Sequence, residues 1–382
     1  MKTILSKSYL FMITVGLLNL YSCKKTDEKL TALKVKSLAE ANDVSAPYTV
    51  STVAGTGEQG YLDGSALQAK ISGVRNLTVN NAGEIYFPDN YNYDTPFSGI
   101  RVYDGNSVRT FSNQYLQFLK FSANGDLFGT NPYSSSAIYK VNKNGKRTVY
   151  AGCEDISGHK DGPAKTARFY GPGAIAIAPD GTMYVSDRKI EEDPITNAIT
   201  KIYIYIRKIT PQGFVSTIVE SISTQGGQLR LPQSYEIGPD GNLYILDLGT
   251  LSKVTPDGII TRIAGFADLS NTDGSLSDSY QDGPIATAKF SSLSNMTVDP
   301  KGTIYLSETQ KGVMHRIRKI SSQGIVSTIA GVPMNPTFDA DFADGVGTNS
   351  RFLHPDGMVY YNHALYVADT ENRRIRKITL PE

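Results

Sequence analysis

The sequence predicts an all-β fold, a six-bladed β-propeller built from four-stranded antiparallel blades. Three observations support it. The chain is rich in short β-prone runs separated by turn residues, one such unit repeats along the chain, and the two chain ends carry complementary parts of a single unit. With 382 residues, 35 Gly, 23 Tyr and no Trp, the composition also fits many short strands joined by turns.

The clearest copy of the repeat spans residues 282–331. It contains four apolar runs, MTV at 296–298, TIYLS at 303–307, RIRKI at 316–320 and IVSTIAG at 325–331. Each run has strand length and is bounded by Pro, Gly, Asp or Ser residues that favour turns. This copy therefore predicts a four-stranded antiparallel meander.

An Asp-Gly pair marks the start of most copies. It is followed, eight residues after the Asp, by a large apolar residue, and the pair occurs at Asp63, Asp161, Asp282 and Asp344. Two further copies lack the pair but keep the turn glycine, Gly125 in one and Gly241 in the other. The count is therefore six copies, and their first strands are expected near residues 76–80, 118–122, 174–178, 234–238, 295–299 and 356–360.

The two ends of the chain complete one blade. The sixth copy stops after its third strand, and the missing fourth strand has the form VSTIAG in other copies. Residues 50–55, VSTVAG, supply that strand from the N-terminal end. Closing a ring in this way removes the exposed strand edges of an open array.

The N-terminus predicts export and a lipid anchor. Lys2 and Lys7 precede an apolar run, residues 9–18, that is too short to span a bilayer and is typical of a signal peptide. The LYSC sequence that ends at Cys23 resembles the bacterial lipoprotein signal, in which the cysteine is lipidated, and the alternative is a plain secreted protein. Lys24 directly after it suggests the outer membrane, with the periplasmic and cell-surface sides both open.

These features divide the chain into three parts. Residues 1–22 are expected to be a signal peptide, residues 23–47 the lipidated cysteine with a polar tether, and residues 48–382 the propeller. The second cysteine, Cys153, then has no partner for a disulfide.

The repeat resembles the NHL repeat. The pattern LYVADTENRRIRKI at 365–378, the PDG turns and the VSTIAG runs carry the resemblance, which covers roughly residues 48–382. NHL propellers share a fold but differ in function, and related propellers include sugar lactonases, strictosidine-synthase-like enzymes and an amidating lyase. The resemblance therefore implies the scaffold and leaves the activity open.

The long connections should all lie on one face, because antiparallel strands send alternate turns to opposite ends. Functional sites commonly occupy such loops. At the mouth of the central channel on this face we expect a ring of hydrogen-bonding groups, with aromatic residues on nearby loops. The expected ligand-binding residues are Arg75, Asn76, Gln233, Asn295, His354, Asp356, Tyr91 and Tyr93.

Amides and an arginine suit ligands that bear hydroxyl or carboxylate groups, and the tyrosines offer stacking faces. The alternative is that these residues merely line a water-filled channel. The repeated acids, such as Asp187 and Asp369, are expected to be structural and to bind backbone N–H groups. The Arg-Lys pairs of the IRKI runs are expected to form a solvated outer face, with Arg207, Arg318 and Arg376 among them.

Charge argues against a nucleic-acid partner. The full chain carries a formal charge of +1, and loss of Lys2 and Lys7 with the signal peptide leaves 36 basic against 37 acidic side chains, or −1. A nucleic-acid-binding domain needs clustered positive charge.

No catalytic residue is assigned from the sequence. The four histidines show no HxxxH or HExxH spacing, so no zinc site is indicated. A Ca²⁺ site would need Asn76, Asn295 and Asp356 as oxygen donors, and otherwise no cofactor is expected. We therefore expect a monomeric, lipid-anchored envelope protein that binds a glycan or a protein partner. The alternative is a metal-assisted hydrolase or lyase of the sugar-lactonase-like type.

Overall fold

In the computed structural model, β-strands run from Thr49 to Thr379. The predicted signal peptide, Cys23 and the tether lie outside the described residues, and within the described part no helix is long and apolar enough to cross a bilayer. The residues described are 47–90, 98–222, 229, 232–247, 249–265, 280–290, 292–310, 314–331 and 342–381.

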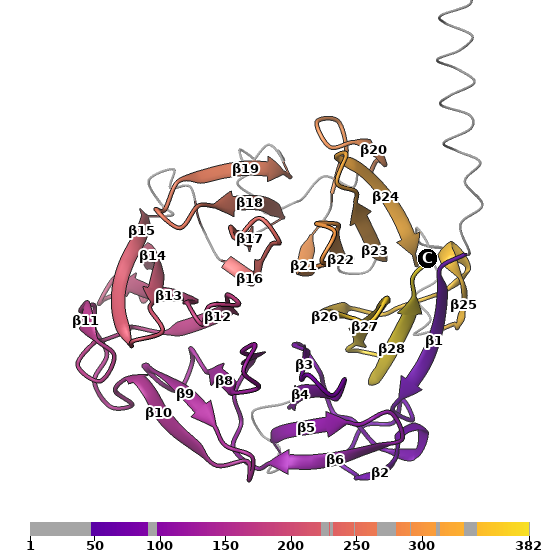
Figure 1. The fold of residues 1–382 in the computed structure, drawn as a ribbon, viewed down its shortest axis with the longest axis horizontal. Coiled ribbons are helices and arrows are strands. Elements are labelled where there is room, and N and C mark those ends of the chain that lie inside the picture. The colour runs from indigo at the N-terminus through magenta and orange to yellow at the C-terminus, as the bar shows by residue number, and fades with distance from the viewer. Residues whose placement is uncertain are drawn as a thin grey trace, which may run out of the picture. The chain divides into compact units, whose positions relative to one another are not determined.

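Six antiparallel sheets stand in a ring around a central axis, which confirms the all-β, six-bladed propeller (Figure 1). In each blade the first strand is innermost and later strands follow outward. The first three blades comprise β3 (Thr78–Val79), β4 (Ile85–Asp89), β5 (Gly99–Tyr103) and β6 (Ser107–Ser112); β7 (Phe118–Phe121), β8 (Leu127–Thr130), β9 (Ala137–Val141) and β10 (Arg147–Gly152); and β12 (Pro172–Ile177), β13 (Met183–Glu192), β14 (Ile199–Ile209) and β15 (Phe214–Ile222).

The other three blades follow the same plan. They comprise β16 (Pro232–Ile237), β17 (Leu243–Asp247), β18 (Thr250–Val254) and β19 (Ile260–Ala264); β21 (Leu293–Val298), β22 (Ile304–Gln310), β23 (Met314–Ile320) and β24 (Ile325–Ala330); and β26 (Pro355–Tyr361), β27 (Ala364–Asp369), β28 (Arg374–Thr379) and β1 (Thr49–Ala54).

The sixth blade is closed from both ends of the chain, as predicted. Its outer strand β1 pairs with β28, so that Thr49 lies opposite Thr379 and Val50 opposite Ile378. The first and last strands thus lie side by side in Figure 1, and both strands find a partner for their backbone groups.

Four blades have a fifth strand that the four-stranded prediction did not include. Each Asp-Gly pair leads into a two-residue strand that pairs with the outermost strand of its own blade. Such a short segment covers the outer edge of the sheet. These strands are β2 (Gly64–Ser65), β11 (Gly162–Pro163), β20 (Gly283–Pro284) and β25 (Gly345–Val346), and short 3₁₀ turns, η1 (Ala66–Gln68) and η3 (Gly347–Asn349), follow the first and last of them.

The arginines of the IRKI runs are buried, so the predicted solvated face was wrong for them. Arg207 is 0% exposed and binds two carboxylates, Asp187 at 3.0 Å and Asp161 at 2.8 Å. We call this arrangement an arginine clasp. It recurs with Arg101 between Asp89 and Asp63, Arg318 between Glu308 and Asp282, and Arg376 between Asp369 and Asp344.

The clasps explain both repeated acids of the sequence. The inner acid also accepts backbone N–H bonds, as Asp187 does from Tyr170 and Gly171 at 2.8 Å each, in agreement with the structural role predicted. The outer acid fixes the Asp-Gly segment against the blade. In the two blades without an Asp-Gly pair, the register places Tyr139 and Ser252 where the arginine would stand.

Apolar cores lie between neighbouring blades. Between the third and fourth blades, for example, Ile204 and Ile206 of β14 pack with Ile245 and Val254. Side chains alternate between the two faces of each strand, so that both faces of a blade contribute to these interfaces. The interfaces hold the inner strands in place around the channel.

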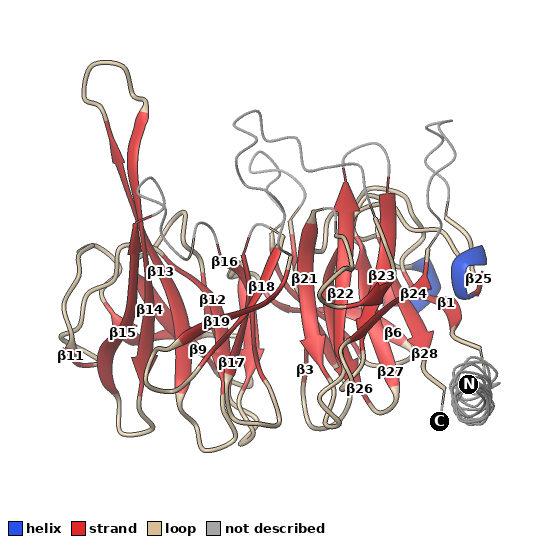
Figure 2. Ribbon diagram, turned by 90° about the horizontal axis from the view of Figure 1, so that it is seen from above, coloured by secondary structure: helices blue, strands red, loops and turns tan. Residues whose placement is uncertain are grey.

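The two faces of the ring differ in their connections. One face carries tight turns such as the one at Gly181, which has φ of +89°. The other carries the long connections, and Figure 2 shows the β13–β14 hairpin projecting well beyond it. The prediction that long loops share one face therefore agrees with the structure, and this is the face on which the site lies.

Candidate functional site

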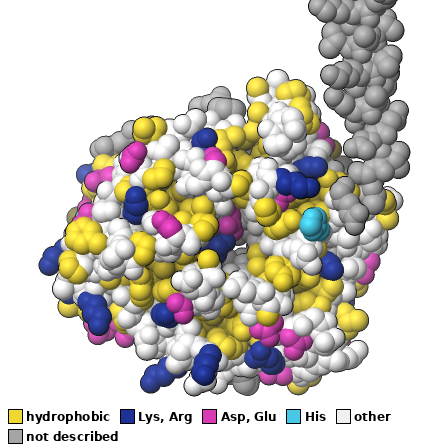
Figure 3. Space-filling model, in the orientation of Figure 1, with side chains coloured by type: hydrophobic (Ala, Val, Ile, Leu, Met, Phe, Trp, Pro, Cys, Tyr) yellow, Lys and Arg dark blue, Asp and Glu magenta, His cyan; other side chains and the backbone are white. Residues whose placement is uncertain are grey.

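A cavity of about 240 Å³ occupies the long-loop end of the central channel, where the inner strands begin. Figure 3 shows the ring from the opposite, tight-turn face, where its centre is also hollowed. Each of the six blades contributes lining residues from its inner strand or from the positions just before it. In the first blade this residue is Arg75. The lining is Arg75, Gln117, Phe118, Pro132, Tyr133, Gly171, Gly173, Ala174, Ser186, Arg188, Ile204, Pro232, Gln233, Ser294, Asn295 and Asp356.

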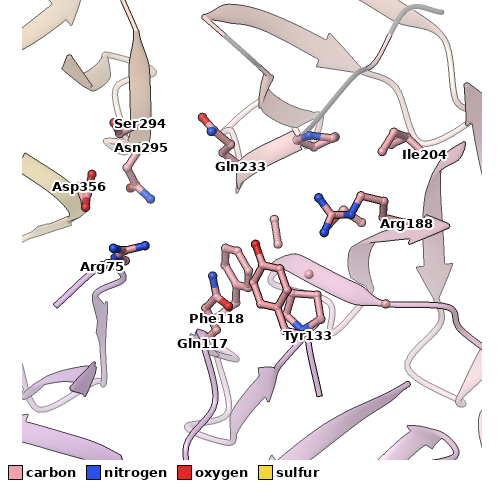
Figure 4. Close-up of a pocket in the computed structure, with 16 residues that line it drawn as sticks. Arg75, Gln117, Phe118, Tyr133, Arg188, Ile204, Gln233, Ser294, Asn295 and Asp356 are labelled. Carbon is pink, nitrogen blue, oxygen red and sulfur yellow. The ribbon is translucent and has the colours of Figure 1, made fainter. Parts of the chain in front are cut away.

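Arg75 and Asp356 face one another on one side of the cavity (Figure 4). Burial raises the pKa of Asp356 above its usual range, while the charges of Arg75 and His354 oppose that rise. Arg75 makes no hydrogen bond or ion pair within the part of the chain that the structure describes. Its guanidinium therefore retains donors for a ligand.

Arg188 lies on the opposite side of the cavity, on β13 (Figure 4). Its guanidinium is 5.9 Å from the centre of the Tyr133 ring, and no carboxylate of the described residues pairs with it. Two guanidinium groups thus face one small cavity that contains a single carboxylate. The excess positive charge and the planar donors favour a carboxylate or another oxyanion.

Neutral polar groups complete the wall. The side-chain Oε1 of Gln233 is buried and has no hydrogen-bond partner in the described structure. An unpaired buried acceptor costs about 1–3 kcal/mol, which a ligand hydroxyl or amide would recover. Gln117 adds a second amide, and the exposed Tyr133 ring adds an apolar surface at the rim.

Asn76 and Asn295 join neighbouring blades. The Asn76 Oδ1 accepts the N–H of Leu119 at 2.9 Å, and the Asn295 Oδ1 accepts the N–H of Met358 at 3.2 Å. Asn295 also lines the cavity, whereas Asn76 lines a narrower space further along the channel. The side-chain amide oxygens of Asn76 and Asn295 therefore have a structural role, as hydrogen-bond acceptors between blades.

The donors do not fit a calcium ion. Ca²⁺ takes six to eight oxygen ligands and prefers several carboxylates. Of the three donors expected, two have their amide oxygens turned to backbone N–H groups, and Asp356 is opposed by Arg75. Within the described residues, no group of three or more His, Cys, Asp and Glu side chains is arranged to hold a metal.

His354 packs on a second histidine. Its backbone N–H donates to the Nδ1 of His315 at 3.3 Å, and the two ring centres are 4.8 Å apart. His354 does not line the cavity. Burial is the main cause that lowers the pKa of His315 to about 4, and the nearby His354 and Arg316 add to it. Tyr91 and Tyr93 lie outside the described residues.

An ion pair crosses the central channel on the side of the cavity away from the long-loop face. Lys120 of β7 and Glu236 of β16 form an ion pair at 2.5 Å, although they belong to the second and fourth blades. Both line the narrower space beyond the cavity, which has a volume of only about 20 Å³. The cavity is therefore open to the long-loop face and constricted beneath.

Sequence reasoning found Arg75, Gln233, Asn295 and Asp356 but missed Arg188 and Phe118. The turn glycines give the starts of the inner strands, and those residues follow from that alignment. Arg188 stands on a second strand, directly after the acid of the clasp, and enters the cavity because β13 continues beyond β12. The unusual length of that connection was the signal that pointed toward it.

The comparisons with known proteins agree with this architecture. The family model of the teneurin NHL domain matches residues 221–379. Over this range the six-bladed propeller is similar to the teneurin NHL domain. Teneurin-3 of Danio rerio is 27% identical over 241 residues, covering 57% of this chain, and teneurin-4 of Mus musculus is 24% identical over 359 residues, covering 84%. The matches span only 8% and 12% of those two proteins.

Solved structures share the fold of this propeller. A protein of unknown function from Bacteroides thetaiotaomicron has a TM-score of 0.64 at 20% identity, over 87% of this chain and 76% of that one. A protein from the same species, described as an auxiliary nutrient binding protein, has a TM-score of 0.58 at 16% identity, over 88% and 77%. A gluconolactonase from Xanthomonas campestris has a TM-score of 0.52 at 12% identity, over 87% and 90%.

Proposed function

We propose that this propeller is a binding module that holds a carboxylate-bearing ligand in the central cavity of its long-loop face. The observation that carries the proposal is that Arg75 and Arg188 line the same cavity and that neither is paired with a carboxylate in the described structure. An unpaired guanidinium at a partly desolvated site is an effective partner for a carboxylate. The ligand is an acidic glycan or the carboxyl group of a protein partner.

The size of the cavity supports a compact recognition element. Pockets for drug-sized ligands measure about 300–1,000 Å³, whereas this cavity measures about 240 Å³. That volume suits one sugar ring or one terminal amino-acid residue. Gln117 and Gln233 can bind its hydroxyl or amide groups, and Tyr133 can cover its apolar face.

The proposal includes an anchor on the cell envelope. The signal-like sequence and Cys23 support a monomer held on the outer membrane by lipid, with the polar segment as its tether. Labelling of the full chain with a palmitate analogue in a bacterial host, compared with Cys23→Ala, tests this part. Equal labelling of both proteins would contradict it.

A thermal-shift experiment tests the ligand class, because a ligand that binds only the folded state raises its midpoint. The probes are glucuronate and galacturonate oligomers and N-acetylated amino acids with free carboxylates. Their neutral counterparts, glucose oligomers and amidated amino acids, are the controls. We expect shifts with the acids that disappear in Arg75→Ala and Arg188→Ala but persist in Arg109→Ala, whose guanidinium lies in an exposed ion pair with Glu84.

Equal shifts with neutral and acidic probes would overturn the proposal.

The hydrolase alternative has less support than the binding module. The gluconolactonase likeness, at 12% identity, concerns the fold alone, and the oxygen donors at the mouth do not suit Ca²⁺. The nutrient-binding likeness at 16% identity is likewise one of fold, so the arginines carry the argument.

A further inference from the structure

Among the described strands, none covers the inner edge of β13 above the cavity. β13 and β14 pair along their whole length, up to Glu192 opposite Ile199. The innermost strand β12 ends its pairing with β13 at Pro172, opposite Asp187, and one more bond joins the Arg188 N–H to the Gly171 carbonyl at 3.4 Å. Beyond that point, no strand of the described structure pairs with the inner edge of β13.

The open edge presents backbone groups toward the channel. In an antiparallel sheet, the N–H and C=O of one residue point to the same side, and the side alternates along the strand. The Arg188 N–H points toward β12, so Ile190 and Glu192 direct their backbone groups to the same side. The register shift near the tip lies on the β14 side, where Glu191 and Glu192 pair with Lys201 and Ile199, and it leaves this alternation intact. Such an edge is a template for an added strand.

The direction of the neighbouring strand determines what an added segment would bring to the cavity. β12 runs from the long-loop face toward the tight turns, antiparallel to β13. A segment added antiparallel to β13 at Ile190 and Glu192 would run in the same direction as β12. Its C-terminal end would then arrive above Gly171 and Gly173, which line the cavity with Arg188.

We propose that the ligand is an extended peptide with a free C-terminal carboxylate, which adds as a strand to β13 and places its carboxylate between Arg188 and Arg75. This inference rests on the proposed function of the cavity. Ile190 has its side chain on the same face as Arg188 and is 38% exposed, and it pairs with Ile202 across the hairpin. The hairpin therefore offers aliphatic contact to the last side chains of the peptide, while the strand edge offers hydrogen bonds.

The first test uses an array of random hexapeptides tethered by their N-termini, half with free C-termini and half amidated, probed with residues 24–382. We expect binding to be confined to peptides with a free carboxylate and to prefer aliphatic residues near the C-terminus. A blank array, or equal binding to amidated peptides, overturns the inference.

The second test separates strand addition from contact with the side chain. The strongest peptides are measured by fluorescence anisotropy with Ile190→Pro and Ile190→Ala. Proline removes the N–H that faces the open edge, which an edge strand tolerates, while alanine keeps it. We expect affinity to fall about five- to tenfold in Ile190→Pro and less than about threefold in Ile190→Ala. Equal affinities of these two variants would contradict strand addition.

Hydrogen exchange of the 183–209 region shows whether the hairpin is intact in Ile190→Pro, since the Lys189 and Glu191 amides point toward β14. The experiments distinguish failure of the peptide proposal from failure of the proposed carboxylate site. Binding of uronate oligomers that needs Arg75 and Arg188, without any peptide binding, keeps the carboxylate site and rejects the peptide.

Discussion

The arginines of the clasps and the arginines of the cavity have the same side chain in opposite circumstances. Arg207 donates to two carboxylates and to the backbone carbonyls of Arg168 and Lys160, at 3.0 and 3.1 Å. Arg75 and Arg188 face a cavity and form no ion pair in the described structure, although Asp356 lies near Arg75. One kind holds the fold together, and the other has unused binding capacity.

The difference teaches how to interpret a repeated residue. Some side chains recur in several blades together with their partners. The charged group of such a side chain is already paired within the protein. A side chain that occurs once interrupts the repeat, as Arg75 does at a position where other blades carry Gln117, Gly173, Gln233 and Ser294. In this propeller the single residues at the channel mouth, not the repeated ones, carry the binding hypothesis.

Breaking a clasp should have the largest effect. In Asp187→Ala the guanidinium of Arg207 stays buried without its inner carboxylate, and two backbone N–H groups lose their acceptor. We expect the free energy of unfolding to fall by about 3–5 kcal/mol. Urea unfolding measures it, with Arg109→Ala as the control, because the loss of an exposed pair changes stability by about 1 kcal/mol or less. Equal losses in the two variants would contradict the structural role of the clasp.

A pH effect of intermediate size should arise from His315, beside the clasp of the fifth blade. Burial lowers its pKa to about 4 from the ordinary 6.5. Between these values the unfolded state binds the proton and the folded state does not, so stability decreases as the pH falls from 6.5 toward 4. The loss from this residue between pH 7 and pH 5 should be roughly 2 kcal/mol.

Unfolding in urea at pH 7 and pH 5 tests this pH effect by comparing the wild type with His315→Asn, which cannot take up a proton. We expect the variant to show a smaller loss of stability between the two pH values. The control is His363→Asn, an exposed position with φ of +58° that asparagine adopts readily. An unchanged pH dependence in His315→Asn would show that His315 is not held neutral by the fold.

The smallest effect on stability should come from the cavity arginines. Arg75→Ala and Arg188→Ala remove no ion pair of the described structure, so the free energy of unfolding should change by less than about 0.5 kcal/mol. Binding of the acidic probes should nevertheless weaken about tenfold or more in each. A loss of stability comparable to that of Asp187→Ala would mean that these side chains are structural after all.

The sequence was sufficient for the architecture because the information is local and repeated. Turn glycines, β-rich runs and the VSTVAG sequence at 50–55 specify six blades and the closure of the ring. Side-chain alternation alone could not reveal that Arg207 is buried. Its second carboxylate, Asp161, lies 46 positions away in a segment that folds back across the blade.

The candidate site was predictable only where it follows the repeat. Arg75, Gln233 and Asp356 were found by aligning the starts of the inner strands. Arg188 could not be found in that way, because it reaches the cavity through a strand that extends past its neighbour. In the fifth blade β22 also extends past its neighbour, but the equivalent position there is Thr309. Departures from a repeat are thus both the hardest parts to predict and the most informative about ligands.

The closure of the sixth blade also governs when the protein can finish folding. Because β1 is among the first residues of the propeller and β28 among the last, the ring cannot close until nearly the whole propeller has left the ribosome. Until then, β1 lacks its partner and the ring retains open edges. Synthesis can thus proceed on an incompletely folded propeller, and the arrival of the final strand sets the moment of cooperative folding.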